Sequence, residues 1–137
     1  MKKTLYDYEE AIKKLPLKDK YTKEELLTDD FLVDKEGNIE IYYAPHNEYI
    51  NPKAKVFIIG ITPGFNQMST AIATARKELE LGDNIKEIQY KCKVAGRFSG
   101  TLRKNIISML NEIELNKALK INDCGELFEE KDYLLHT

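Results

Sequence analysis

The chain has 137 residues, of which 42% are hydrophobic and 32% charged, a composition typical of a folded globular protein rather than a disordered one. The net charge of −2 argues against a general binder of polyanions, and no apolar stretch approaches the roughly 20 residues that a transmembrane helix needs. The first ten residues lack the apolar core of a signal peptide. We therefore expect a single cytoplasmic domain over residues 1–137, without a membrane partner.

The first part of the chain predicts two helices and a hairpin. Apolar residues recur at helical steps up to Pro16, which ends the first helix. Thr22 and Glu25 form a capping box that opens the second. Apolar residues on both sides of Gly37 predict a β-hairpin. The expected spans are 5–15 and 22–27 for the helices, and 31–33 and 39–43 for the strands.

The most informative segment runs from Lys53 to Phe65. A continuous apolar run that includes Val56 and Ile59 leads into the turn Gly60-Ile61-Thr62-Pro63-Gly64. Such a run is typical of a strand buried on both faces of a parallel sheet. Ligands of these sheets bind beyond the carboxyl ends of the strands, so the turn is a candidate site. It contains no Asp, Glu, His, Ser or Cys.

The second part of the chain predicts three helices and the beginning of a strand near Tyr133. Ser69 or Thr70 can cap the first of these helices, and Gly82 can end it. The expected spans are 69–81, 84–94 and 102–115. This order favours a parallel strand pair with a helical crossover. Two strands are a poor core, so the hairpin, a partner or further chain is expected to complete the sheet.

Two sets of residues allow different interpretations. Cys92 and Cys124 are isolated, with no histidine at metal-ligand spacing, which favours unpaired thiols and no metal or other cofactor. Basic residues concentrate between Lys86 and Lys104 on an otherwise acidic chain. This stretch is either a phosphate-contacting surface around Arg97 and a helix start or a solvated helix face.

The segment Ile58-Ile59-Gly60-Ile61-Thr62-Pro63-Gly64 resembles the first active-site motif of the uracil-DNA glycosylase superfamily. In that superfamily a buried strand ends in Gly-x-(Asp, Asn or Ala)-Pro-(Tyr or Gly), and the form seen here is closest to the mismatch-specific branch. The basic loop over residues 96–105 also resembles uncharacterised bacterial members. The resemblance implies an α/β fold, a three-layer αβα arrangement around a parallel central sheet. It also implies DNA or a nucleobase as ligand, with hydrolysis of an N-glycosidic bond in DNA repair.

The resemblance also assigns roles to individual residues. Thr62 stands where active relatives carry the Asp or Asn that orients the attacking water, so it is the catalytic candidate. A Thr hydroxyl can bind a water but cannot act as a base near neutral pH. The substrate-binding candidates are Gly60, Ile61, Pro63, Gly64 and Phe65. The nucleic-acid-binding candidates are Arg97, Ser99, Arg103 and Lys104.

The second motif of that superfamily, a His-Pro-Ser-type loop, is absent. The expected fold is therefore a C-terminally truncated form, and whether the chain is an enzyme stays open. The alternatives are a non-catalytic module that binds nucleic acid or protein, a homo-oligomer, or a fragment that needs a missing C-terminal partner segment.

Overall fold

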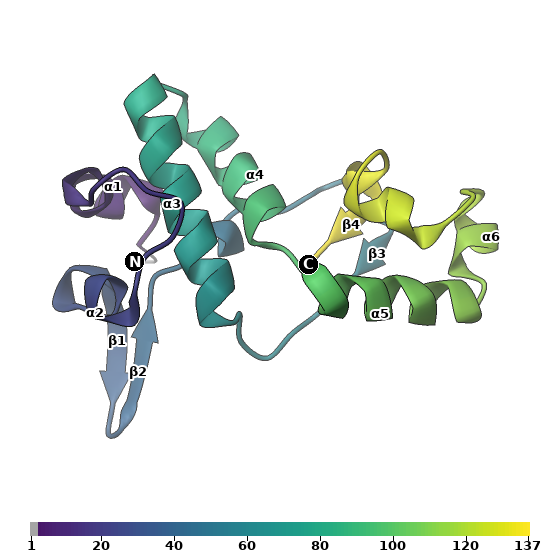
Figure 1. The fold of residues 1–137 in the computed structure, drawn as a ribbon, viewed down its shortest axis with the longest axis horizontal. Coiled ribbons are helices and arrows are strands. Elements are labelled where there is room, and N and C mark those ends of the chain that lie inside the picture. Colours follow the sequence, from purple (N-terminus) through teal and green to yellow (C-terminus); the bar gives the residue numbers. More distant parts are fainter. Residues whose placement is uncertain (1–2) are drawn as a thin grey trace. The chain divides into compact units, whose positions relative to one another are not determined.

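The computed structural model describes residues 3–137 and is mostly helical, with 56% helix and 10% strand (Figure 1). It divides into two compact units. Unit 1 contains the residues up to Tyr49 together with Thr62–Arg97, and unit 2 contains Ile50–Ile61 and Phe98–Thr137. The described strands form two separate two-stranded sheets, β1–β2 and β3–β4.

The predicted three-layer αβα fold is therefore wrong for this chain. The described residues contain no central parallel sheet, and the parallel strands β3 (Val56–Phe57) and β4 (Leu135–His136) are only two residues long. The apolar run after Lys55 does not extend as a ladder because it pairs only with the short segment near His136. Helices supply most of the buried surface instead.

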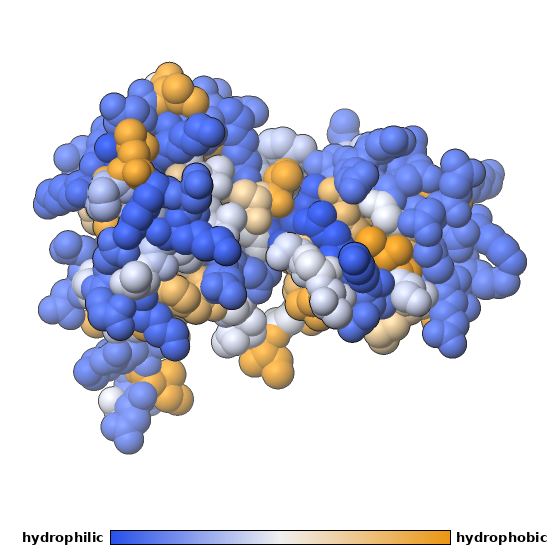
Figure 2. Space-filling model, in the orientation of Figure 1, coloured by the Kyte–Doolittle hydropathy of each residue, from blue (hydrophilic) through white to orange (hydrophobic). Residues whose placement is uncertain are grey.

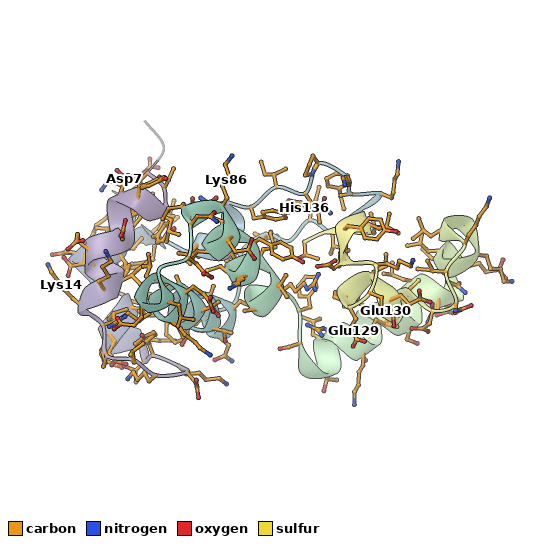
Figure 3. The ribbon with its side chains drawn as sticks, turned by 90° about the horizontal axis from the view of Figure 1, so that it is seen from above. Asp7, Lys14, Lys86, Glu129, Glu130 and His136 are labelled. Atoms are coloured by element: carbon orange, nitrogen blue, oxygen red, sulfur yellow. The ribbon has the colours of Figure 1, made fainter. Side chains whose placement is uncertain are left out.

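Unit 1 begins with the helices and hairpin that the sequence predicts. Pro16 and the capping box at Thr22 act as expected, with the Thr22 amide donating to Glu25 Oε2 at 2.8 Å. A second capping box, which was not predicted, opens α1, where the Thr4 amide donates to Asp7 Oδ2 at 2.7 Å. Asp7 and Lys14 lie at opposite ends of α1 (Figure 3). The negative charge near the start and the positive charge near the end stabilise the helix through its dipole. The elements are α1 (Leu5–Lys14), α2 (Lys23–Leu26), η1 (Asp29–Phe31), β1 (Leu32–Glu36), β2 (Ile39–Tyr42) and η2 (Pro45–Asn47).

Two longer helices complete unit 1 and lie side by side (Figure 1): α3 (Phe65–Leu81) and α4 (Ile85–Gly96). Gly82 ends α3 in the left-handed conformation, as predicted, with φ of 80°. The predicted start is wrong, because the helix begins four residues before Ser69, and Ser69 is a buried residue inside it. The core between these helices and α1 includes Leu5, Ile12, Leu26, Phe31, Ala71, Ile72, Ile88 and Cys92.

Unit 2 packs one long helix against the parallel strand pair. The predicted parallel pairing of β3 and β4 is confirmed, with Val56 opposite Leu135 and Phe57 opposite His136. The Lys55 amide donates to the Leu134 carbonyl at 2.7 Å, and the Ile58 amide to the His136 carbonyl at 2.8 Å. The remaining elements are α5 (Gly100–Glu112), α6 (Leu115–Leu119), η3 (Cys124–Phe128) and η4 (Asp132–Leu134).

The strand pair is covered on one face only, which corrects the expectation of burial on both faces. Val56 and Ile58 pack into a cluster with Leu135 and the α5 residues Ile106 and Leu110. The alternate residues are exposed: Phe57 by 60%, Ile59 by 92% and Ile61 by 102%. We call these three residues the bare face. Apolar side chains also interrupt the mostly hydrophilic surface elsewhere (Figure 2).

The hairpin does not complete the β3–β4 sheet, because β1 and β2 pair only with each other. Gly37 turns the chain with φ of 59°, and Ile39 and Ile41 are exposed by 69% and 53%. Both cysteines are unpaired, as predicted, and the structure shows that both are buried. Among residues 3–137 no helix is long and apolar enough to cross a bilayer, and no group of His, Cys, Asp or Glu is placed to hold a metal ion.

Candidate functional site

The turn that follows β3 is an exposed corner. Gly60, Ile61, Thr62, Pro63 and Gly64 are all exposed, and Phe65 is half-buried at the start of α3. We call residues 60–64 the Gly-Pro corner. A Cβ added at Gly60 would meet nothing within 4 Å, so the backbone there is open to solvent. The corner presents amide groups and the Thr62 hydroxyl, but it has no side chain that can act as an acid or base.

The Gln67 side chain holds the second half of the corner. Its Oε1 accepts a hydrogen bond from the Gly64 amide at 2.8 Å, and its Nε2 donates to the Gly96 carbonyl at 2.8 Å. Gln67 therefore joins the start of α3 to the end of α4 within unit 1. This contact explains why α3 begins at Phe65, since Gln67 satisfies an amide at the helix start that has no intrahelical acceptor.

The chain passes from one unit to the other within the predicted site. Gly60 and Ile61 belong to unit 2, whereas Thr62 to Phe65 belong to unit 1. The basic residues divide in the same way: Arg97 belongs to unit 1, and Ser99, Arg103 and Lys104 to unit 2. Neither unit by itself contains all the residues that the sequence analysis assigned to the site.

Two of the predicted basic contacts have structural roles. Arg97 is only 7% exposed at the end of α4, where its amide donates to the Lys93 carbonyl at 3.1 Å. The Nε of Arg103 donates to the Phe98 carbonyl, and its guanidinium lies 5.2 Å from the centre of the Phe128 ring. Arg103 thus ties the start of α5 to η3.

Ser99 and Lys104 remain open to solvent at the same helix start. Ser99 is the N-cap residue of α5, makes no side-chain cap hydrogen bond and is exposed, as is Lys104. The first turn contains no acidic residue. We call Ser99, Arg103, Lys104 and the intervening first-turn amides the α5 start. Amides at a helix start lack intrahelical acceptors, so they favour an anion there.

A buried histidine lies next to α4, and no motif in the sequence indicates it. His46 is only 4% exposed in η2, and neither ring nitrogen has a hydrogen-bond partner among the described residues. Burial, with a smaller contribution from Lys93, lowers the pKa of His46 from 6.5 to about 4. The imidazole is therefore neutral near pH 7.

The tyrosines near the strand entry serve mainly for packing. Tyr43 is 5% exposed, its ring centre lies 3.9 Å from that of Tyr8, and its hydroxyl donates to Glu48 at 2.6 Å. Tyr42 and Tyr43 also line a cavity of about 330 Å³ in unit 1. The other lining residues are Lys3, Val33, Ile41, Ala44, Asn47 and Glu48. None of them belongs to the corner or to the α5 start.

Comparison with known proteins finds one informative relative. The chain is 42% identical over 133 residues to YoxB of Bacillus subtilis (strain 168), described as an uncharacterized protein. The match covers 97% of this chain and 51% of YoxB, so the chain spans about half the length of the relative. No family model matches the sequence. No solved structure matches it either.

Proposed function

We propose that this chain binds nucleic acid through the α5 start and does not complete a catalytic site by itself. The observation that carries the proposal is the α5 start. Its first turn has no acidic residue, the side chain of the N-cap residue Ser99 makes no cap hydrogen bond, and Lys104 is exposed. Free amides and a cation at one helix end are suited to a phosphate group. Arg103 adds positive charge beside them while it holds the loop in place.

The part of the Gly-Pro corner that belongs to unit 2, Gly60 and Ile61, is the proposed contact for a base. Its exposed amides permit close approach of a ligand, and Ile61 offers an apolar surface against which a base can pack. The resemblance of this segment to the uracil-DNA glycosylase motif supports a nucleobase rather than another planar ligand. Phosphate contacts would supply most of the affinity, because they depend on charge and not on sequence.

Salt-dependent binding tests the proposal. A fluorescently labelled single-stranded oligonucleotide of mixed sequence is titrated with the chain, and anisotropy is measured at several salt concentrations from about 50 mM upward. Lys104→Ala should weaken binding several-fold at low salt. It should also reduce the slope of log K against log salt by about 1, the value for one lost phosphate contact. Lys117→Ala is the matched control, since Lys117 is an exposed lysine of unit 2 already paired with Glu114.

Equal effects of Lys104→Ala and Lys117→Ala would contradict the proposal, because binding would then follow net charge and not the α5 start. Binding that does not change with salt would contradict it as well. Either result would favour the alternative that this basic stretch is a solvated helix face.

Base removal is the second candidate, favoured by the accessibility of Thr62 in the corner. Its test is release of uracil from uracil-containing and mismatched duplexes at a large excess of protein. We expect no release, because the corner offers a hydroxyl but no carboxylate or imidazole to activate water. Release that is lost in Thr62→Ala would assign the catalytic role to Thr62 and overturn the non-catalytic part of the proposal.

A further inference from the structure

The bare face consists of three exposed apolar residues spaced two positions apart in the sequence. Phe57 is the last residue of β3, and Ile59 and Ile61 follow it at two-residue steps beyond the strand; all three are exposed, whereas Val56 and Ile58 pack inward. Single apolar residues on a surface are common, but three successive outward positions of one segment with 60%, 92% and 102% exposure are not. Strands in parallel pairs are ordinarily buried on both faces.

The residues that alternate with the bare face, Val56 and Ile58, are covered by the rest of unit 2. Val56 and Ile58 pack against residues of α5, and Leu135 is only 5% exposed. The rest of unit 2 therefore satisfies one side of the strand pair. Among its described residues, none covers Ile59 or Ile61, which are almost fully exposed.

We propose that the bare face docks a polypeptide segment equivalent to the half of YoxB that lies outside the match. The relative carries a counterpart of nearly this whole chain together with about as much chain again. That additional chain is joined to the matched half, so its effective concentration at this surface is high. The proposal shares Ile61 with the proposed base contact, so it is tested at Ile59, which belongs neither to the Gly-Pro corner nor to the α5 start.

Thiol labelling tests this proposal directly, because the two native cysteines are buried and burial raises the pKa of both thiols. Ile59→Cys is introduced into the chain alone and into a fusion that joins the chain to the unmatched half of YoxB. The rate of modification by a thiol reagent is measured in both proteins. Ile39→Cys is the matched control, an exposed isoleucine on a strand of unit 1.

We expect labelling at position 59 to be at least about tenfold slower in the fusion than in the chain alone, and labelling at position 39 to change less than about twofold. Equal rates at position 59 in the two proteins would overturn the proposal. Protection at position 59 in the chain alone that increases with protein concentration would also overturn it, since a second copy would then be the occupant.

A second measurement does not depend on the fusion. The chain and the unmatched half of YoxB are co-expressed as separate polypeptides, and the purified material is analysed by sedimentation. A one-to-one complex that forms with Ile39→Lys and is lost with Ile59→Lys supports the proposal. Absence of the complex, or a complex unaffected by Ile59→Lys, contradicts it.

Discussion

The Ser69 hydroxyl makes both backbone hydrogen bonds of Tyr21, a residue 48 positions away in the sequence. Its Oγ accepts from the Tyr21 amide at 2.7 Å and donates to the Tyr21 carbonyl at 3.1 Å. Ser69 is 1% exposed, so water does not reach this pair. Without the hydroxyl, the Tyr21 amide and carbonyl would be buried with no hydrogen-bond partner. The Ser69 side chain thus holds Tyr21, in the segment between α1 and α2, against α3.

Removal of this hydroxyl should be costly. We expect Ser69→Ala to lower the free energy of unfolding by about 2–4 kcal/mol, because it leaves two backbone groups without partners in the interior. Ser108→Ala, on an exposed position of α5, should change it by less than about 0.5 kcal/mol. Urea unfolding followed by circular dichroism measures both. A cost of Ser69→Ala no larger than that of the control would show that water can replace the hydroxyl.

Gly96 is required by the neighbouring imidazole. A Cβ at this position would lie 2.9 Å from Cγ of His46, closer than real Cβ contacts. We expect Gly96→Ala to destabilise the protein by about 1–2 kcal/mol, since the overpacking outweighs the gain in helix propensity. Gly60→Ala is the control, because a Cβ there meets nothing within 4 Å. A stabilised Gly96→Ala variant would mean that His46 moves away at little cost.

The buried His46 should make stability depend on pH. Its pKa is lowered from 6.5 to about 4 by burial, so between these values the unfolded chain binds a proton that the folded chain does not. Stability should therefore be complete above about pH 6.5 and fall as the pH drops toward 4, by up to about 3 kcal/mol. His46→Gln should flatten the profile between pH 6.5 and 5, where carboxylates contribute little.

The measurement for His46 combines unfolding at several pH values with an NMR titration of the imidazole protons. An apparent pKa near 6.5 in the folded protein would contradict the burial of the ring. A pH profile that is the same in His46→Gln and in the native chain would assign the dependence to other groups.

Asn51 holds the strand β4 through its amide group. Its Nδ2 donates to the carbonyls of Tyr133 at 2.5 Å and Leu135 at 3.1 Å, and the residue is 6% exposed. Asn51→Asp should cost about 3 kcal/mol or more, because a buried carboxylate would face two carbonyl oxygens. Hydrogen exchange of the Ile58 amide, which pairs with His136, should then become faster.

Asn105→Asp is the control for this change, as Asn105 is an exposed residue of α5 in the same unit. Its effect on unfolding and on exchange of the Ile58 amide should be small. If Asn51→Asp and Asn105→Asp behave alike, the amide of Asn51 does not hold β4.

Local patterns predicted the elements that depend on a few adjacent residues. The capping box at Thr22, the stop at Gly82 and the hairpin turn at Gly37 all lie where the sequence places them. The parallel pairing of β3 with β4 was also predicted. The cap, the helix stop and the turn follow from backbone conformation and short-range hydrogen bonds, which a short stretch of sequence encodes. The parallel pairing was inferred instead from the order of strands and helices along the chain.

The pattern of apolar residues did not predict which face of the β3 segment is covered. The run that includes Val56 and Ile59 predicted a strand buried on both faces within a three-layer fold, but the structure buries one face only. Phe57 and Val56 are equally apolar in sequence, and only the position of α5 distinguishes them. The candidate site shows the same limit. Arg97 and Arg103 are both arginines of one basic stretch, but Arg97 is buried, whereas Arg103 donates a hydrogen bond to the Phe98 carbonyl.

The amino-acid sequence by itself determined the capped start of α2, the end of α3 at Gly82 and the hairpin turn at Gly37, because those features depend on neighbouring residues. Only the tertiary structure decided that Ser69 bonds to Tyr21, that His46 is buried against Gly96, and that Ile59 faces solvent. These outcomes depend on contacts between segments far apart in the chain, and the apolar or polar character of a residue does not specify its partner.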